Sequence, residues 1–376
     1  MRIVFIGTCY PMRGGLAHFN AILARKLSPR HQVTFLSFTR QYPEFLFPGK
    51  TQYVTDADRA AVARYDAEPM VDSIAPWSWW RTARRAAREQ PDLLMYKYWM
   101  PFFAPAFGTI SRWVKRWSNA RVLFICDNII PHERRLFDTA LTRYAVSPVD
   151  GFITMSESVT QDLLRVKPDA RWKLIQHPIY NIFGDRGEKR EARERLKLEE
   201  GPWILFFGYI RKYKGLDLLL RALVEARRRL PVRLLVAGEF YEGETEYRRL
   251  VSELGLESAV RFHDQYIPED EVRFVFSACD AVVLPYHSAT QSGIVQIAYQ
   301  LDCPVICTDV GGLKEVVLDG ETGFIVPPED PAALAQAIVR YYADNWEPRM
   351  RQGVEREKLK YSWAPLVDAI EELGDA

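Results

Sequence analysis

The chain has few cysteines, little excess charge and no long apolar run. Its 376 residues include five cysteines, none in a Cys-x-x-Cys pair, so the sequence indicates neither a disulfide framework nor a zinc knuckle. A formal net charge of +1 gives no overall attraction to nucleic acid. The apolar run at 3–6 is too short for a signal peptide, and no run reaches membrane-spanning length. We therefore expect a cytoplasmic protein, free or peripheral on the inner face of the plasma membrane, with no nucleic-acid partner.

The apolar content is sufficient for two cores. Hydrophobic residues make up 48% and charged residues 26%, and the length suggests two or three domains. Short apolar runs without polar alternation are typical of parallel strands covered on both faces. Such strands are predicted at 2–6, 32–37, 93–96, 122–126, 151–155, 173–176, 203–207, 233–237, 260–262, 281–284, 305–307 and 324–326. Helical patterns between them, for example at 16–27, 158–166 and 294–300, predict a doubly wound α/β fold.

The strand pattern begins again after a charged, glycine-bounded segment at 184–202. We therefore predict two Rossmann-like domains, 1–181 and 182–358, and a C-terminal helix in 359–376 that packs back on the first domain. Two such domains in tandem would leave a cleft between them, because open α/β sheets bind ligands at the carboxyl ends of their strands. Two independent domains without a shared site are the alternative, which the lack of a Gly/Ser-rich or Pro-rich linker disfavours.

Two glycine-containing turns in the second half are suited to a phosphate group. At 206–223 a strand ends at Gly208, and Arg211 and Lys214 precede Gly215 and an apolar helix. Glycine lets the backbone approach a ligand, and the two cations suit a diphosphate. A solvated basic turn explains this pattern equally well.

The second turn is the small, polar run before the helix predicted at 294–300. Gly293 and its neighbours would expose backbone N–H groups at the positive end of that helix, where phosphate binds readily. Ser292 could instead be only the N-cap of this helix.

Taken in order, these motifs resemble the GT-B glycosyltransferases of family 4 over nearly the whole chain. The resemblance rests on Arg13-Gly14-Gly15, on Gly208 to Lys214-Gly215, and on the run from Cys303-Pro304-Val305-Ile306 through Gly311-Gly312 to Asp319-Gly320-Glu321-Thr322-Gly323. It implies a retaining transfer from a UDP- or GDP-sugar, without a metal ion or other cofactor. The acceptor would be a glycan or a lipid-linked acceptor in surface polysaccharide or glycolipid assembly. Arg211, Lys214 and the backbone at 292–294 would neutralise the departing diphosphate.

The resemblance places donor contacts in both halves of the chain. The expected donor-binding residues are Gly14, Gly15, Gly208, Arg211, Lys214, Gly238, His263, Tyr266, Gln291, Ser292, Gly293, Ile294 and Gln296. The family usually carries two glutamates that would fall at Ala289 and Ile297, and residues 286–301 contain no acidic residue. Gln291 or Gln296 could replace them with neutral hydrogen bonds.

The acceptor side is expected around 126–133. The family often has a histidine where this chain has Asp127, which could orient or deprotonate an acceptor hydroxyl. His132 and Glu133 could do so instead. Equally, Asp127-Asn128 could form an Asx-turn and His132-Glu133 could open a helix. The catalytic candidates are Asp127, His132, Arg211 and Lys214, and the acceptor-binding candidates are His18, Asn128 and Glu133, although His18 could also be a packed helix residue.

Tryptophan and basic residues concentrate at 77–121. The tryptophans are Trp77, Trp79, Trp80, Trp99, Trp113 and Trp117, and the basic residues include Arg81, Arg84, Arg85, Arg88, Lys97, Arg112, Lys115, Arg116 and Arg121. Aromatic residues beside basic ones suit the headgroup region of an anionic membrane or a lipid-linked acceptor. The alternative is that this segment enters a helix packed against the core, with its basic residues on the solvent-exposed face.

Two other functions remain open from the sequence. The missing glutamates would also suit a non-catalytic nucleotide-sugar-binding subunit. A sugar-nucleotide epimerase or a phosphorylase could be built on the same two-domain plan, since fold does not fix function.

Overall fold

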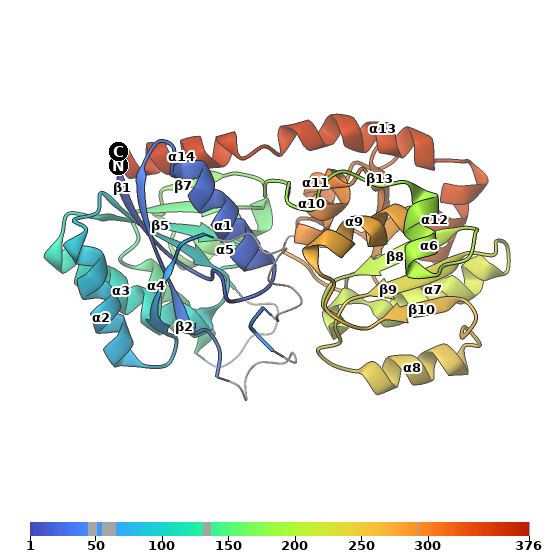
Figure 1. Ribbon diagram of the computed structural model, residues 1–376, viewed down its shortest axis with the longest axis horizontal. Helices are drawn as coiled ribbons and strands as arrows, with labels where there is room; N and C mark the ends of the chain where they lie inside the picture. The colour runs from blue at the N-terminus through green and yellow to red at the C-terminus, as the bar shows by residue number, and fades with distance from the viewer. Residues whose placement is uncertain (44–50, 55–64, 131–136, 291, 376) are drawn as a thin grey trace. The chain divides into compact units, whose positions relative to one another are not determined.

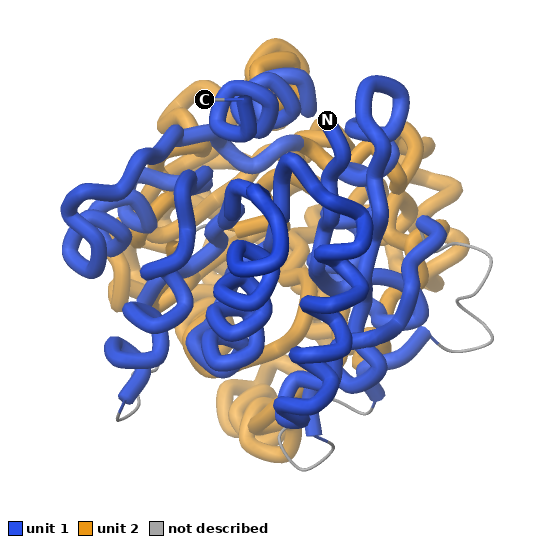
Figure 2. The backbone as a smooth tube through the Cα atoms, turned by 90° about the vertical axis from the view of Figure 1, so that its left-hand side faces the viewer, with its two compact units in different colours: residues 1–178, 363–376 blue, residues 179–362 orange. Residues whose placement is uncertain are grey.

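The computed structural model describes residues 1–43, 51–54, 65–130, 137–290 and 292–375. They form two compact units, each with its own parallel sheet (Figure 1). The first unit comprises residues 1–178 and 363–376, and the second comprises residues 179–362 (Figure 2). From the sequence, we predicted the boundaries between these units at 181/182 and 358/359.

The first unit is a seven-stranded sheet with the strand order β3-β2-β1-β4-β5-β6-β7. Its strands are β1 (Arg2–Ile6), β2 (Gln32–Arg40), β3 (Glu68–Asp72), β4 (Leu93–Tyr98), β5 (Arg121–Cys126), β6 (Gly151–Thr154) and β7 (Trp172–Leu174). Its helices are α1 (Gly15–Leu27), α2 (Pro76–Arg88), α3 (Ala104–Trp117), α4 (Asp138–Val146), α5 (Glu157–Val166) and α14 (Ala364–Asp375), with a 3-10 turn η3 (Pro101–Phe103).

Side chains of β4 alternate between the two faces of this sheet. Tyr96 and Tyr98 join a core that also contains Phe107 of α3. Lys97, between them, points to the opposite face, where its Nζ lies over the ring of Phe19 from α1. Helices α2 and α3 therefore cover one face of β4, and α1 covers the other.

Helix α14 also packs on the first sheet, against β5, β6 and α1. Its apolar residues Leu366, Ile370 and Leu373 are buried. A Cβ on Gly374 would lie 3.0 Å from Met1 Sδ, so the two ends of the described chain lie side by side (Figure 1).

The second unit is a six-stranded sheet with the order β10-β9-β8-β11-β12-β13. Its strands are β8 (Trp203–Phe207), β9 (Arg233–Ala237), β10 (Val260–His263), β11 (Ala281–Leu284), β12 (Val305–Thr308) and β13 (Gly323–Val326). Its helices are α6 (Lys189–Leu196), α7 (Leu216–Arg227), α8 (Glu244–Glu253), α9 (Glu269–Ala278), α10 (Gly293–Gln300), α11 (Leu313–Val316), α12 (Pro331–Ala343) and α13 (Glu347–Glu357), with the 3-10 turns η4 (Lys212–Lys214) and η5 (Lys358–Lys360).

Strand β8 is buried at every position, as expected for the centre of a parallel sheet. Ile204 and Phe206 belong to the core shared with α7, α8 and α12. Phe207 lies on the other face, where its ring packs 4.9 Å from that of Phe276 in α9.

The strand order of the two sheets reverses at equivalent places. In the second unit the chain runs outward from β8 to β9 and β10, then returns to place β11 on the other side of β8. Open α/β sheets bind ligands at such a switch point, outside the carboxyl ends of the strands. The ends of β8 and β11 are therefore the natural site of chemistry in this unit.

A glycine brings the chains leaving these two strands together. Gly215, just after η4, has a φ of 68°, and a Cβ there would lie 1.9 Å from the carbonyl oxygen of Pro285. The backbone N–H of His287 donates to the carbonyl of Tyr213 at 2.8 Å. The turn after β8 can rest on the chain after β11 only if residue 215 has no side chain.

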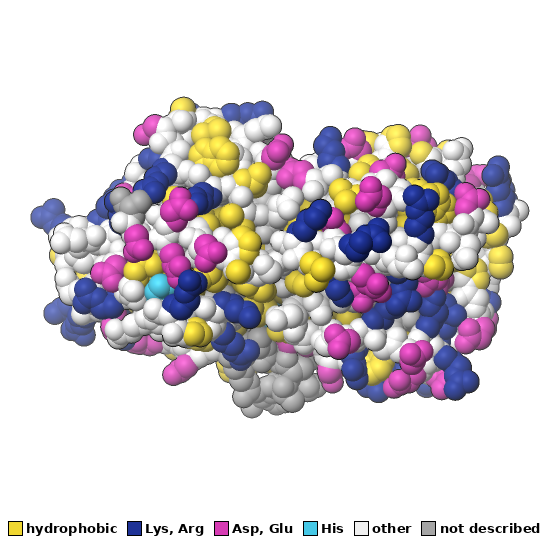
Figure 3. Space-filling view, turned by 90° about the horizontal axis from the view of Figure 1, so that it is seen from above, with side chains coloured by type: hydrophobic (Ala, Val, Ile, Leu, Met, Phe, Trp, Pro, Cys, Tyr) yellow, Lys and Arg dark blue, Asp and Glu magenta, His cyan; other side chains and the backbone are white. Residues whose placement is uncertain are grey.

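The two parallel, doubly wound sheets confirm the predicted α/β class. Strand β3 was missed, because it is an edge strand on which Val71 is the only fully buried residue and which lacks an apolar run. None of the helices in the described part of the chain is long and apolar enough to cross a membrane. On the face seen in Figure 3, basic and acidic side chains are interspersed.

We expect Gly215→Ala to lower the free energy of unfolding by at least about 3 kcal/mol. An alanine there would be held in a left-handed backbone conformation, and its Cβ would clash with the backbone of Pro285. Gly255→Ala is the matched control, because Gly255 has a φ of 64° and no atom within 4 Å of its would-be Cβ. That control should lower the free energy of unfolding by only about 1–2 kcal/mol. The free energy of unfolding in urea measures both, and equal losses would contradict the role given to the Pro285 contact.

Candidate functional site

The turn after β8 buries a lysine at the switch point of the second sheet. Gly208 follows β8 with a φ of 95°, Arg211 is the N-cap of η4, and Lys214 is its last residue. Lys214 is 7% exposed and Arg211 is half-buried. In the part of the chain that the structure describes, no carboxylate forms an ion pair with either cation. Burial, together with the charge of Arg211, lowers the pKa of Lys214 to about 7.

Lys214 meets the start of helix α10. A Cβ on Gly208 would lie 3.1 Å from Lys214 Nζ and 3.2 Å from Ile294 Cδ1, so these three residues converge. The ring of Tyr286 lies 5.9 Å from Lys214 Nζ, and its hydroxyl lies 3.4 Å from Ser292 Oγ. An ammonium beside a helix N-terminus creates a positive potential that an anion would relieve.

Helix α10 begins at Gly293, with Ser292 as its N-cap. The Ser292 hydroxyl accepts the backbone N–H of Ile294 at 3.3 Å, so the capping interpretation of Ser292 is observed. Gln296, in the next turn, is 1% exposed, and its Oε1 accepts no hydrogen bond from any described residue. Gln291 lies outside the described residues.

The glycine after β9 closes the same edge of the sheet. A Cβ on Gly238 would lie 2.2 Å from the carbonyl oxygen of Gly208. The backbone N–H of Gly208 donates to Ala237 and that of Gly238 donates to His263. The chains leaving β8, β9 and β10 are therefore held together by their backbones.

The predicted nucleobase residues lie farther along the edge. His263 is the last residue of β10, and its Nε2 lies 2.9 Å from Gln265 Nε2. Tyr266 is half-buried three residues later. Because β9 separates β10 from β8, a ligand that reaches both Lys214 and His263 must span two strands.

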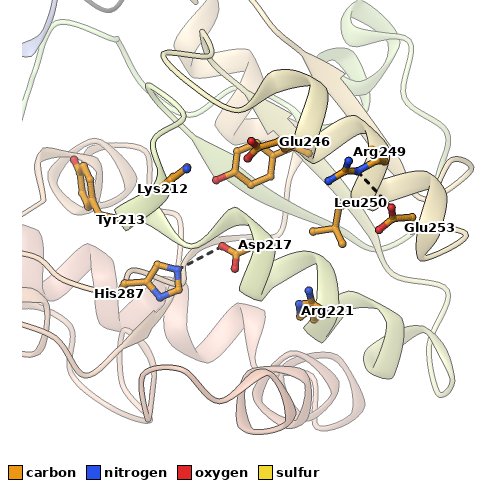
Figure 4. Close-up of a pocket in the computed structure, with 10 residues that line it drawn as sticks. Lys212, Tyr213, Asp217, Arg221, Glu246, Arg249, Leu250, Glu253 and His287 are labelled. Carbon is orange, nitrogen blue, oxygen red and sulfur yellow. Dashed lines mark hydrogen bonds and ion pairs between the residues drawn. The ribbon is translucent and has the colours of Figure 1, made fainter.

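A pocket of about 610 Å³ lies beside the same turn, between α7 and α8 (Figure 4). Its lining includes Lys212, Arg221 and Arg249 but also Asp217, Glu246 and Glu253, so the charges are balanced. His287, on its wall, lies with Nε2 3.4 Å from Asp217 Oδ1 and pairs through Nδ1 with Glu329. His287 thereby links α7 to the chain after β11, and this pocket favours an anion less than the surroundings of Lys214 do.

In the first unit, Asp127 directly follows β5 and pairs with a lysine that sequence reasoning did not single out. Lys97 Nζ lies 2.7 Å from Asp127 Oδ1, and the two side chains are 0% and 12% exposed. Counting Lys97 among the basic surface residues of 77–121 was wrong, because the pleat of β4 turns it inward. The available signal was a lysine inside an otherwise apolar strand.

The other candidates of the first unit lie on α1 or beside β5. Gly14 is the N-cap of α1 with a φ of 103°, Gly15 is its first residue, and His18 is buried within the helix. Asn128 Nδ2 donates to the carbonyl of Trp99 at 3.3 Å. His132 and Glu133 lie outside the described residues.

The tryptophans of 77–121 divide between core and surface. Trp79, Trp99 and Trp117 pack against the core of the first unit. Trp77 is 67% exposed and stacks on Trp80 at 5.0 Å, and Trp113, 37% exposed, lies 5.0 Å from Trp117. The core interpretation therefore holds for some of these residues and not for others.

Residues 201–344 match the family described as "Glycosyl transferases group 1". The D-inositol 3-phosphate glycosyltransferase of Frankia alni is 33% identical over 195 residues, which cover 49% of this chain and 48% of that protein. The protein of the same name in Corynebacterium diphtheriae is 32% identical over 246 residues, which cover 61% of this chain and 57% of that protein. The chain thus spans about half the length of the curated relatives it matches.

Solved structures resemble the chain over its whole length. Anabaena HepE in complex with UDP-glucose superposes with a TM-score of 0.77 at 16% identity and covers 99% of both chains. Sucrose-phosphate synthase from Thermosynechococcus elongatus gives a TM-score of 0.71 at 20% identity, covering 99% of this chain and 98% of that one. The chain therefore has the GT-B fold of two Rossmann-like domains, and residues 201–344 of its second half are similar to the glycosyl transferases group 1 family.

Proposed function

We propose that this chain is a retaining glycosyltransferase that moves a sugar from a UDP- or GDP-sugar to a glycan or lipid-linked acceptor in surface polysaccharide or glycolipid assembly. The observation that carries the proposal is Lys214, buried beside Arg211 and the start of α10 without a described carboxylate partner. A leaving diphosphate develops negative charge as its bond to the sugar breaks. Cations and N–H groups fixed in advance stabilise that charge most strongly in a site with little water.

On the donor side, the UDP-glucose in the HepE complex supports a nucleotide sugar. Gln296 is our candidate for the missing glutamates, since its buried amide oxygen can accept a hydrogen bond from a sugar hydroxyl. On the acceptor side, we assign Asp127 to an acceptor hydroxyl. An inositol phosphate belongs in the acceptor panel, because it appears in the relatives' names.

One observation favours a second candidate function, a nucleotide-sugar-binding subunit without catalysis. Residues 286–301 contain no Asp or Glu where the resembling family has two glutamates. Such a subunit would bind UDP or GDP and neither transfer nor hydrolyse the sugar.

We expect Lys214→Ala to lower kcat/KM for sugar transfer about 100- to 1,000-fold, the usual loss when one preorganised charge-stabilising group is removed. Lys212→Ala is the matched control, since Lys212 is an exposed lysine in the same turn. The control should keep near-normal turnover. Transfer would be followed with UDP- and GDP-sugars against glycan, lipid-linked and inositol phosphate acceptors. Near-normal turnover of Lys214→Ala would contradict the diphosphate assignment, and tight UDP or GDP binding without turnover by the wild type would favour the binding subunit.

We also expect the affinity for UDP or GDP to fall as the pH rises above about 7. Lys214 is largely neutral above its pKa of about 7, and a diphosphate binds its charged form, so binding takes up a proton. Between about pH 7.5 and 9.5, where the phosphates are already ionised, Kd should rise by up to about tenfold per pH unit. Calorimetric titrations measure this dependence. Lys214→Arg should remove it, because arginine stays charged, and an equally steep dependence in that variant would assign the proton to another group.

We further propose that the exposed faces of α2 and α3 contact an anionic membrane surface. The two helices pack against each other (Figure 1). On α2, Arg81, Arg84 and Arg88 are exposed on the same side as Trp77, at helical spacing. Among the described residues, no carboxylate pairs with these three arginines. Exposed tryptophans with unpaired arginines suit the interface of an anionic bilayer.

Replacing Arg81, Arg84 and Arg88 by glutamine should weaken binding to phosphatidylserine-containing vesicles about 100-fold, at about 1 kcal/mol per arginine. Cosedimentation at low and high salt measures this. The matched control replaces the exposed arginines Arg190, Arg228 and Arg249 of the second unit by glutamine. Equal losses in both triple variants, or equal binding to neutral vesicles, would show that α2 is not the contact.

A further inference from the structure

Lys97 is an unexpected residue for its place in the fold. It is the fifth of six residues of β4, a strand with neighbours on both sides, and its side chain is 0% exposed. Tyr96 and Tyr98 point into the core with α3, so Lys97 lies on the face covered by α1. A buried ammonium is strongly unfavourable unless a partner of opposite charge lies beside it.

The surroundings of Lys97 hold its ammonium in one place. Asp127 Oδ1 lies 2.7 Å from Lys97 Nζ. The centroid of the Phe19 ring lies 3.5 Å from the same atom, and Met155 Sδ lies 3.3 Å from it. The contacts combine an ion pair with a cation–π interaction, and burial keeps solvent from screening either of them.

The other titratable groups facing Lys97 are neutral. His177 packs edge-on against Phe19 with the ring centroids 5.0 Å apart, and burial together with the charge of Lys97 lowers the pKa of His177 to about 3. Burial likewise raises the pKa of the Cys126 thiol, which precedes Asp127. Among the described groups around the Lys97 ammonium, Asp127 is therefore the one that carries the opposite charge.

The pair is asymmetric in its access to solvent. Lys97 is wholly enclosed, whereas the Asp127 side chain is 12% exposed and stands just beyond the carboxyl end of β5. Ligands of open α/β sheets bind at this edge. A ligand can thus reach the carboxylate without reaching the ammonium behind it.

We propose that Lys97 is the positioning residue of the acceptor site. It holds the Asp127 carboxylate in one orientation, so that the carboxylate accepts a hydrogen bond from the acceptor hydroxyl. The group that meets Asp127 is then an uncharged hydroxyl, because a phosphate or carboxylate there would be repelled. This inference rests on the proposed transfer reaction, and Lys97 acts in it only through Asp127.

The test compares the pH profiles of kcat/KM for the wild type and Lys97→Gln. Lys97→Gln removes the fixed positive charge behind the acceptor site, so the acid limb of the profile should move up by at least about one pH unit. Lys173→Gln is the matched control, because Lys173 of β7 forms a surface pair with Glu372 in the same unit. Its profile should coincide with that of the wild type. UDP binding, which belongs to the second unit, should be unchanged in both variants.

A double-variant cycle separates positioning from direct contact. Asp127→Asn should lower turnover about 100-fold through loss of orientation of the hydroxyl. Adding Lys97→Met should lower it no further, because Lys97 has no other route to the acceptor. This pair of variants also decides the matter if Lys97→Gln does not fold, since the double variant leaves no unpaired buried charge.

An unshifted Lys97→Gln profile in an active enzyme, or additive losses in the double variant, would overturn the inference and leave the proposed function standing. Absence of transfer by the wild type with every donor and acceptor would overturn both.

Discussion

The turn after β8 reaches the chain after β11 only because residue 215 has no side chain, and the site depends on that contact. Gly215 rests on the carbonyl of Pro285, and the turn it terminates carries Lys214 into the protein. The ammonium loses its water there without gaining a described carboxylate. Burial of a charge in this way disfavours the charged form, and a bound anion restores it. The backbone contact thus holds in place the buried cation that we propose binds the donor diphosphate.

Among the described residues, each unit buries one lysine near the carboxyl edge of its parallel sheet, and the two lysines differ in their charged neighbours. Lys97 has Asp127 at 2.7 Å, so its charge is satisfied inside the protein and serves to fix the carboxylate. Lys214 has Arg211 as its charged neighbour, so its charge is left for a ligand. A low local dielectric strengthens both effects. In the proposed function, lysine therefore positions a residue in one sheet and binds a ligand in the other.

Most of the fold could be predicted because parallel strands buried on both faces must be continuously apolar. Each predicted run became a strand of one of the two sheets, and the most apolar, such as that of β8, lie at their centres. Strand β3 could not be predicted, since its pairing with β2 leaves Glu68 and Pro69 exposed at an edge. The glycine turn with Arg211 and Lys214 was also readable, because positive φ and cationic side chains leave local signatures.

By itself, the sequence determined the alternation of strands and helices, the restart of the pattern in the second half, and the positions of the turns. Those features depend on neighbours along the chain. Only the tertiary structure decided which charges are paired. From the sequence, Lys97 was grouped with the surface arginines. In the structure, the pleat of β4 turns it inward toward Asp127, 30 residues farther along the chain. Lys214 and Arg211 are ordinary basic residues of a turn until the chain after β11 buries one of them. Charge pairing and burial are set by residues distant in sequence, which no local pattern records.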